Sequence, residues 1–500
     1  MRSPLPAPLT PGAASNPTRL DVSARVDVDA KVLERLRGAC AEVRTDDGSR
    51  VEAGRDWWPL SAVWAVADTA PALPSVVVKP SSTGEVAEVL SVCHEARVPV
   101  TAFAGASGVC GASVPLHGGV SLDMTGLSGI VSVDPDSMLV DVRAGTFGVP
   151  FEEGLRRDHG LTLGHWPQSI ALSTVGGWIA CRGAGQYSTR YGKIEDMVVG
   201  LEVVLADGRV VRTGGSAPRA ATGPDLNQVF VGSEGTLGII TEARLRARPA
   251  PAAERRAAFG FESFAEGLDA CRRVLRRGAT PAVLRLYDRP ETARQFELAD
   301  TSALIVVDEG DPVVVDAVME VVARECAGAV PLDVALADRW LEHRNSLPAL
   351  ESLVRAGIVA DTVEVSGSWR ALPGIYDQAV AELMDVEGTI AASAHQSHAY
   401  TDGGCLYFTF AGRPADGTTA AAESYYRRAF DAVTEPVIRA GGAISHHHGI
   451  GLNRGPYMRA YLGGAFAVLE SLKSALDPRG ILNPGKLGLP SPFGEGLNTP

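Results

Sequence analysis

The chain has 500 residues, which is more than one ordinary hydrophobic core, and about two to four domains are expected at roughly 100–200 residues each. Hydrophobic residues make up 45% and charged residues 21% of the chain, which excludes a wholly disordered or fibrous protein. The formal net charge of −13 gives no support to binding of a polyanion such as nucleic acid. No apolar run reaches the roughly 18–20 residues that a bilayer-spanning helix needs.

The seven cysteines are dispersed along the chain without a Cys-x-x-Cys pair, which excludes a zinc ribbon and a redox pair of that type. An odd, dispersed set is typical of a reducing compartment, and we expect a cytoplasmic protein. Prolines occupy the N-terminus where a signal peptide would have an apolar core, so residues 1–17 are predicted to be a disordered tail. Residues 490–500 are predicted to be a second tail.

A β-α-β unit is predicted after an N-terminal helical segment, residues 18–73, in which Asp29–Arg44 is expected to be a helix. Ser75–Lys79 and Val98–Phe103 have the β-branched composition of strands. Between them a capping box opens at Ser82, and apolar residues then recur at helical spacing.

A glycine-rich loop, Ala104–Gly111, comes directly after the second of these strands. Glycine-rich backbone after a strand can surround a pyrophosphate with N–H groups, but a Rossmann fingerprint would also open a helix. Here a strand is predicted next, at Val120–Met124. The loop therefore indicates either a phosphate-binding site outside a Rossmann fold or a structural turn.

The character of the sequence changes near residue 250. Before it, short strands and turns predominate, including a hairpin over Glu202–Val211. Residues 250–440 alternate amphipathic helices with strands, which predicts a separate α+β domain. Residues 441–489 return to sequence punctuated by Gly and Pro.

Three successive histidines, His446, His447 and His448, stand in the glycine-rich segment Ser445–Gly451. In an extended chain the first and third would point to one side and the second to the other. Three of only ten histidines gathered in an apolar context favour use in an active site. A metal site and a purely structural cluster are the alternatives.

Two predicted strands carry a polar side chain among apolar ones. Tyr407 alternates with phenylalanines in Leu406–Phe410, where the pattern fits both a core tyrosine and an acid/base. Arg285 stands in Val283–Tyr287, where it would bind an anion such as phosphate or pair with a carboxylate. His165 belongs to a further polar cluster that is locally no more than a loop.

Seven segments, taken together and in order, resemble those of the vanillyl-alcohol-oxidase-type (p-cresol-methylhydroxylase-type) FAD proteins, and most closely the alkylglycerone-phosphate synthase family. They are residues 102–113, 173–178, 191–196, 232–238, 405–408, 445–449 and 477–485. The triple histidine and the Cys-Leu-Tyr-Phe sequence at 405–408 separate that subgroup from glycolate- and lactate-type dehydrogenases.

The resemblance covers residues 55–489 and implies an α+β protein. It would consist of a two-part FAD-binding PCMH-type domain at 74–249 and an α+β cap domain over the flavin at 250–440. A C-terminal segment, 441–489, would return to the flavin site.

By motif matching, the resemblance places a general acid/base at Tyr407 and essential histidines at His446, His447 and His448. Arg285 would contact a substrate phosphate. The residues implied to bind FAD, non-covalently, are Ala102, Phe103, Ala104, Gly105, Ala106, Ser107, Gly108, Pro167, Gln168, Ser169, Ile170, Ala171, Leu172, Ser173, Ala180, Cys181, Arg182, Gly183, Glu234, Gly235, Thr236, Leu237, Gly238, Ile239 and Ile240.

The implied activity exchanges the acyl chain of acyl-dihydroxyacetone phosphate for a fatty alcohol in ether lipid synthesis, with no net electron transfer by the flavin. The alternative is an FAD-dependent dehydrogenase or oxidase of a hydroxy acid or alcohol. Two departures from the family pattern point toward the alternative: Leu350 stands where the family has Arg, and Gln168 where it has Asp. Leu350 and His165 are nevertheless expected at the substrate.

We expect a small-molecule or lipid substrate, no nucleic acid partner, no resident metal and no transmembrane segment. A lipid substrate would bring the protein into peripheral contact with a membrane. A homodimer is compatible with the sequence.

Overall fold

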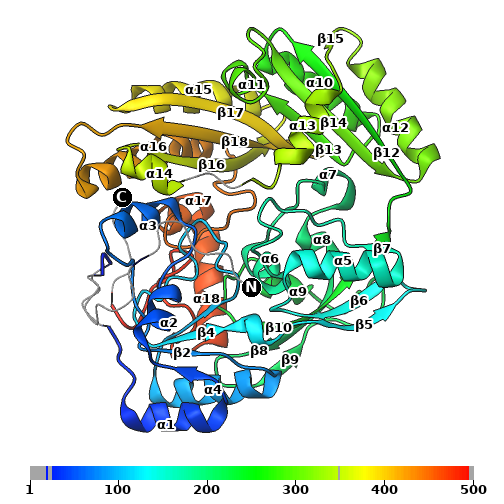
Figure 1. The fold of residues 1–500 in the computed structure, drawn as a ribbon. Helices are drawn as coiled ribbons and strands as arrows, with labels where there is room; N and C mark the ends of the chain where they lie inside the picture. The colour runs from blue at the N-terminus through cyan, green and yellow to red at the C-terminus, as the bar shows by residue number, and fades with distance from the viewer. Residues whose placement is uncertain (1–8, 10–17, 21–24, 347–349, 495–500) are drawn as a thin grey trace.

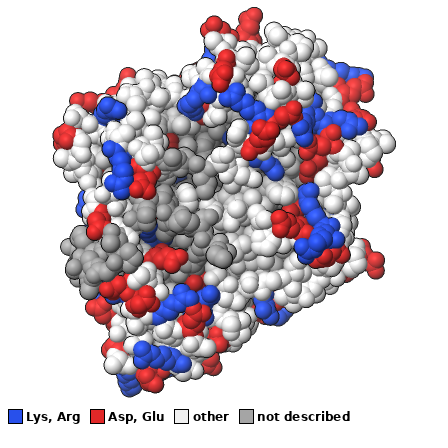
Figure 2. Space-filling view, in the orientation of Figure 1, with Lys and Arg blue, Asp and Glu red and all other residues white. Residues whose placement is uncertain are grey.

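The computed structural model of the protein describes residue 9 and residues 18–20, 25–346 and 350–494 (Figure 1). The predicted tails at 1–17 and 490–500 lie largely outside the described residues. Figure 1 shows a broad sheet with its helices, built from the middle of the chain, above two smaller sheets from the first half. Lys and Arg are interspersed with Asp and Glu on the face seen in Figure 2.

The first small sheet contains the predicted β-α-β unit. Its strands, in spatial order, are β1 (Val43–Arg44), β2 (Val76–Val78), β4 (Val120–Asp123) and β3 (Val100–Phe103). The last three are parallel, as a β-α-β connection requires. The helix between β2 and β3, α4 (Thr83–Ala96), begins where Ser82 accepts a hydrogen bond from the backbone of Glu85, which is one half of the predicted capping box; the Glu85 carboxylate accepts from the backbone of Ser81 rather than of Ser82.

The predicted helix Asp29–Arg44 is shorter in the structure. Helix α1 (Ala30–Ala39) ends because Cys40 adopts an extended backbone, and Val43–Arg44 then pairs antiparallel with β2. The chain forms β1 here instead of further helix, because pairing with β2 gives backbone N–H and C=O groups of both strands hydrogen-bond partners.

The second small sheet is antiparallel and lies beside the first. Its strands, in spatial order, are β5 (Ile130–Asp134), β6 (Leu139–Arg143), β10 (Ile239–Arg246), β8 (Val198–Val204) and β9 (Val210–Arg212). The predicted hairpin joins β8 to β9, with Gly208 at φ 88° in the turn. Helices α5 (Gly148–His159) and α6 (Val175–Cys181) pack on this sheet.

Short elements connect these sheets. They are α2 (Asp47–Glu52), α3 (Pro59–Val66), η1 (Met124–Gly126), β7 (Leu161–Thr162), α7 (Ser188–Tyr191), α8 (Ile194–Met197), α9 (Asn227–Phe230) and β11 (Arg248–Pro249).

The α+β half of the chain is built on one seven-stranded antiparallel sheet, which we call the cap sheet. Its strands, in spatial order, are β15 (Val330–Pro331), β12 (Ala253–Phe261), β14 (Ser302–Gly310), β13 (Val283–Tyr287), β17 (Thr389–Ala399), β18 (Gly403–Gly412) and β16 (Val359–Ser368). Its helices are α10 (Phe264–Arg276), α11 (Arg289–Phe296), α12 (Pro312–Glu325), α13 (Ala335–His343), α14 (Leu350–Arg355), α15 (Leu372–Asp385) and α16 (Thr419–Arg439).

Alternation along the cap-sheet strands separates a core face from a polar face. Leu406, Phe408 and Phe410 are fully buried in the cluster that also holds the apolar sides of α10, α15 and α16. Tyr407 lies between them in sequence and therefore faces the other way, as does Arg285 between two buried leucines of β13. The cap sheet lies above the first half of the chain in Figure 1, and Tyr407 on its polar face contacts His447 and His448 of the C-terminal segment.

The C-terminal segment contacts the first half of the chain. It contains η2 (Gly455–Tyr457), α17 (Met458–Leu462), η3 (Gly463–Ala465) and α18 (Phe466–Leu476). Leu482 then forms a bridge with Val100 of β3, and Lys486 donates to the carbonyl of Val114. Among the described residues, no helix combines the length and the apolar composition that crossing a membrane requires.

Candidate active site

The glycine-rich loop after β3 presents an open set of backbone donors. Within the described chain, no backbone N–H of residues 104–108 is used by a protein acceptor. A side chain at Gly105 would meet the carbonyl oxygen of Leu172 at 1.8 Å, so only glycine allows the loop this close to the segment 167–173. Free N–H groups beside a second predicted FAD segment are the donor set that a pyrophosphate requires.

Glu234 links a further predicted FAD segment, residues 234–240, to the C-terminal segment. Its carboxylate accepts hydrogen bonds from the backbone of Ile450 at 2.6 Å and of Gly451 at 2.8 Å, and Asn483 donates to its carbonyl at 2.7 Å. Three stretches of chain that are distant in sequence are thereby fixed around one site, and together with the open loop they fit a bound dinucleotide.

His165 is buried in this part of the molecule, with its ring 4.6 Å from that of Trp178 on α6. Neither ring nitrogen has a hydrogen-bond partner within the described residues, and burial lowers the pKa of the ring to about 3. The sequence predicts His165 at the substrate; the structure places its ring against Trp178, with no contact to the triple histidine among the described interactions.

The register of the cap sheet places four polar side chains in one row. Tyr287, His395, Tyr407 and Glu364 are successive cross-strand partners on β13, β17, β18 and β16. The ring of Tyr407 stacks on that of His395 at 4.8 Å, and its hydroxyl receives a hydrogen bond from Thr362 at 3.1 Å. We call this set the polar row.

The triple histidine meets the polar row at Tyr407. The Tyr407 ring lies 5.9 Å from that of His447 and 5.4 Å from that of His448. The predicted alternation of faces is wrong, because residues 446–448 form a bend rather than a strand. The bend arises because Glu364 accepts hydrogen bonds from the backbone N–H of all three histidines.

A continuous hydrogen-bonded chain leads away from the triple histidine. His447 Nδ1 lies 3.0 Å from His446 Nδ1, and His446 Nε2 lies 2.9 Å from the Tyr400 hydroxyl. Ser188 Oγ lies 3.1 Å from that hydroxyl and 2.8 Å from His398 Nδ1. Ring nitrogens of His398, His446 and His447 lie within 4.8 Å of one another, which is also close enough for a shared metal ion.

Burial keeps the histidines of the site uncharged near neutral pH. It lowers the pKa of His446 and of His447 to about 3, and the pKa of His448 to about 4. Burial raises the pKa of Tyr407 above its ordinary value, and the neighbouring histidines do not offset this because they are uncharged. Neutral imidazoles offer no positive charge to a phenolate, so Tyr407 is protonated at neutral pH.

Arg285 has no carboxylate partner among the described interactions. Its Nε donates to the Tyr287 hydroxyl at 2.8 Å, and its Nη2 hydrogen bonds to Nε2 of His395. The sequence left two possibilities for Arg285, an anion-binding role or a pair with a carboxylate. Its hydrogen-bond partners are a phenol and an imidazole, neither of which carries the negative charge that would neutralise the guanidinium.

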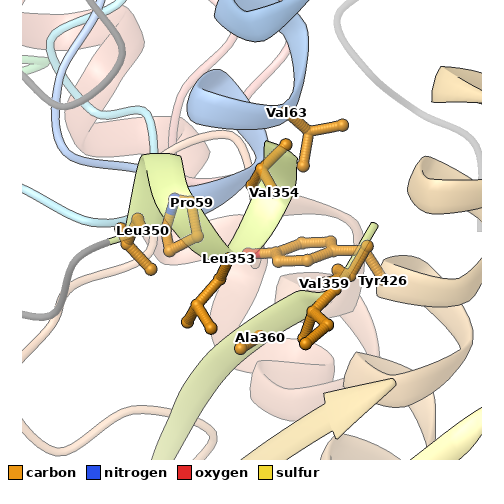
Figure 3. A pocket seen from close by; sticks show the side chains of 9 residues that line it. Pro59, Val63, Leu350, Leu353, Val354, Val359, Ala360 and Tyr426 are labelled. Atoms are coloured by element: carbon orange, nitrogen blue, oxygen red, sulfur yellow. The ribbon is translucent and has the colours of Figure 1, made fainter. Parts of the chain in front are cut away.

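Leu350 lies apart from the polar row. It lines an apolar pocket between α3, α14 and β16 (Figure 3), whose walls are Pro59, Val63, Leu350, Leu353, Val354, Ile358, Val359, Ala360 and Tyr426. It is 8% exposed. Gln168, at the other departure, donates to the backbone of Ser346 at 2.8 Å and so ties a predicted FAD segment to the cap domain.

Comparison with known proteins identifies the fold to which this site belongs. Residues 74–214 match the FAD binding domain family, and residues 250–487 match the C-terminal domain of FAD linked oxidases. The uncharacterized FAD-linked oxidoreductase YgcU of Escherichia coli K12 is 34% identical over 439 residues, covering 83% of this chain and 89% of its own. The chain belongs to the FAD-linked oxidase family.

Alkyldihydroxyacetonephosphate synthase of Dictyostelium discoideum is 31% identical over 454 residues, covering 83% of this chain and 73% of its own. A solved alkyldihydroxyacetonephosphate synthase matches with a TM-score of 0.75 and 26% identity, covering 93% of this chain and 89% of that structure. The predicted family, its α+β PCMH-type architecture, the FAD cofactor and the assignment as an enzyme are confirmed.

Several residues of the site were not predicted from the sequence. Glu364, His395 and His398 lie on two strands, and Tyr400 directly follows one of them; the pairing of these strands with β18 cannot be predicted from local sequence. One signal was present: His395-Gln-Ser-His398 places two further histidines shortly before Tyr407.

Proposed function

We propose that this FAD enzyme performs an alkylglycerone-phosphate-synthase-like exchange, in which a fatty alcohol replaces the acyl chain of acyl-dihydroxyacetone phosphate. The observation that carries the proposal is the grouping of Tyr407, the neutral triple histidine and Arg285 on the polar face of the cap sheet. It combines a proton donor, uncharged proton acceptors and one fixed cation.

The proton transfers of such an exchange balance within these residues. Tyr407, protonated at neutral pH, donates its proton to the departing carboxylate. A neutral imidazole of the triple histidine accepts the proton of the entering alcohol. Return of that proton to Tyr407, whose ring contacts His447 and His448, restores the site.

Arg285 would hold the phosphate, since a guanidinium offers several N–H donors to an oxyanion. The open backbone of residues 104–108, with the segments around Leu172 and Glu234, would hold FAD. When bound, FAD supplies a ring system that can accept and return an electron pair.

Incubation of the purified holoenzyme with acyl-dihydroxyacetone phosphate and a labelled fatty alcohol tests the proposal. We expect labelled alkyl product and released fatty acid, with no net bleaching of the flavin absorbance. Absence of labelled product under conditions where the flavin remains bound would contradict it.

A second candidate is an FAD-linked dehydrogenase of a hydroxy acid, and the position of Leu350 favours it. The residue that aligns with a family arginine lies in an apolar pocket and supplies no charge to a phosphate. For this activity Arg285 would bind the carboxylate of the substrate, and a neutral histidine would accept the hydroxyl proton. Anaerobic bleaching of the flavin by an unphosphorylated hydroxy acid would support this candidate over the exchange.

A further inference from the structure

Arg285 is held by neighbours that leave part of its guanidinium free. Nε and Nη2 are committed to Tyr287 and His395, and the guanidinium carbon lies 5.5 Å and 5.8 Å from the ring centres of Tyr287 and Trp340. Among the described residues, no protein acceptor is recorded for Nη1. An arginine fixed in this way can present the remaining N–H groups to an anion without a further loss of side-chain entropy.

His395 can accept the hydrogen bond from Arg285 in only one protonation state. Its Nδ1 lies 2.7 Å from Oε2 of Glu291, and both side chains are buried. An ionised carboxylate accepts but cannot donate, so the ring proton is on Nδ1 and Nε2 carries the lone pair. Burial and then the charge of Arg285 lower the pKa of His395 to about 4, so the ring is neutral near pH 7.

Glu291 is itself fixed by the structure around it. It lies in the first turn of α11, whose N-cap Asp288 accepts a hydrogen bond from the Glu291 backbone at 2.8 Å. Its Oε1 accepts hydrogen bonds from Arg294 at 2.8 Å and from Thr409 at 3.0 Å. Thr409 lies two residues after Tyr407 on β18, so one strand carries both the acid/base and an anchor of Glu291.

We propose that Glu291 and His395 are positioning residues that orient Arg285 as the anion-binding donor of the site. Glu291 selects the tautomer of His395, His395 fixes the guanidinium, and the guanidinium sets where the anionic group of the substrate lies relative to Tyr407. The inference rests on the proposed function only in assigning the anion to Arg285; phosphate and carboxylate share this chemistry.

Binding of two probe anions to the holoenzyme, glycerol 3-phosphate and D-lactate, tests the inference through perturbation of the flavin spectrum. His395→Phe should raise the Kd of whichever anion binds by about 10-fold or more, the loss expected for a misplaced charge-assisted contact. His395→Gln should recover part of the affinity, because its amide oxygen can accept from Arg285 at the position of Nε2. Neutral glycerol serves as the control ligand, and its affinity should not change.

Glu291→Gln tests whether Glu291 acts by selecting the tautomer of His395 or only by packing against its ring. The new amide can donate to Nδ1, which moves the ring proton to Nε2 and turns a donor toward Arg285. This variant should therefore weaken anion binding as His395→Phe does, and ¹⁵N shifts of the His395 ring should report the changed tautomer. Arg294→Gln is the matched control, since it removes another partner of Glu291 but leaves His395 in place.

The inference would be overturned if neither anion bound the wild-type holoenzyme, or if His395→Phe and Glu291→Gln bound anions as the wild type does. It would also be overturned if anions and glycerol were weakened equally, which is the result of a structural role. Failure of the proposed function is distinguishable: anion binding that depends on His395, without exchange activity, removes the synthase assignment and leaves the positioning role intact.

Discussion

Glu364 and Arg454 form an ion pair of 2.6 Å in which each side chain is no more than 1% exposed. Burial opposes ionisation of Glu364, but the Arg454 guanidinium holds its pKa well below the usual range. The same carboxylate accepts from the Ser445 hydroxyl at 2.9 Å and from the backbone of the triple histidine. A single buried charge on β16 thus determines the conformation of the histidine segment.

Glu364→Gln should destabilise the protein strongly. The amide oxygen of Gln can still accept from the histidine backbone, but Arg454 is left as a buried charge without a counterion. Loss of one partner of a buried pair costs about 3–5 kcal/mol. Thermal and chemical unfolding of the variant would measure the loss.

Glu382→Gln is the matched control for this substitution. Glu382 pairs with Arg439 at the same distance of 2.6 Å, but the two side chains are 40% and 55% exposed. An exposed pair contributes about 0–1 kcal/mol, so this variant should unfold almost as the wild type does. Equal effects of the two substitutions would show that the buried pair has no special role.

The β-α-β unit and the side of β18 on which Tyr407 lies could be predicted because their signals are local. Ser82 caps α4 as its spacing with Glu85 indicated, and Tyr407 faces away from the apolar side of β18 as alternation required. The bend at the triple histidine could not be predicted, because its cause is Glu364, a residue 82 positions before His446.

The positions of His395 and His398 illustrate a second limit. Strict alternation along β17 would turn these two histidines to opposite faces of the sheet. A register shift between Gln396 and His398 brings both to the polar face, where one contacts Tyr407 and the other His446. No local sequence pattern predicts this bulge, because the bulge depends on how β17 pairs with β18.

Tyr407→Phe should keep the fold and the FAD but lower turnover by about 100-fold or more, the usual contribution of a positioned acid/base. The substitution removes only a hydroxyl that receives a hydrogen bond from Thr362. Tyr425→Phe is the control, since it removes a hydroxyl at Thr389 on the helix-covered side of the sheet. If Tyr407→Phe retained activity, the hydroxyl would not act in catalysis and Tyr407 would be a structural residue of the core.

The activity should not show an acid limb near pH 6.5. Since the neutral histidines are the proton acceptors and their pKa values lie at about 3 to 4, activity should fall only as the pH approaches those values. A profile of kcat/KM from pH 8 to pH 5 would measure this. Asp361→Asn is the control, because burial raises the pKa of that carboxyl to about 7 and could add an unrelated limb.

The flavin should be held without a covalent bond. Residues 101–108 contain no His, Cys or Tyr, and burial raises the pKa of Cys110, which follows them, well above the ordinary value for a thiol. Acid precipitation of the holoenzyme should therefore leave yellow flavin in the supernatant. Flavin in the pellet of the wild type but not of Cys110→Ser would identify that thiol as the attachment point.

Leu350→Arg should not restore a phosphate contact. Leu350 lines the apolar pocket together with Pro59, Val63 and Tyr426 (Figure 3), and no residue of the polar row is among the lining residues. An arginine there would be a buried charge without a partner, and we expect a loss of several kcal/mol in the free energy of unfolding. Leu350→Met, which conserves volume, should cost less than about 1.5 kcal/mol. If Leu350→Arg instead remained as stable as the wild type and bound glycerol 3-phosphate more tightly, its side chain would reach the site. In that case, the absence of the family arginine would be the reason for any weak exchange activity of the wild-type enzyme.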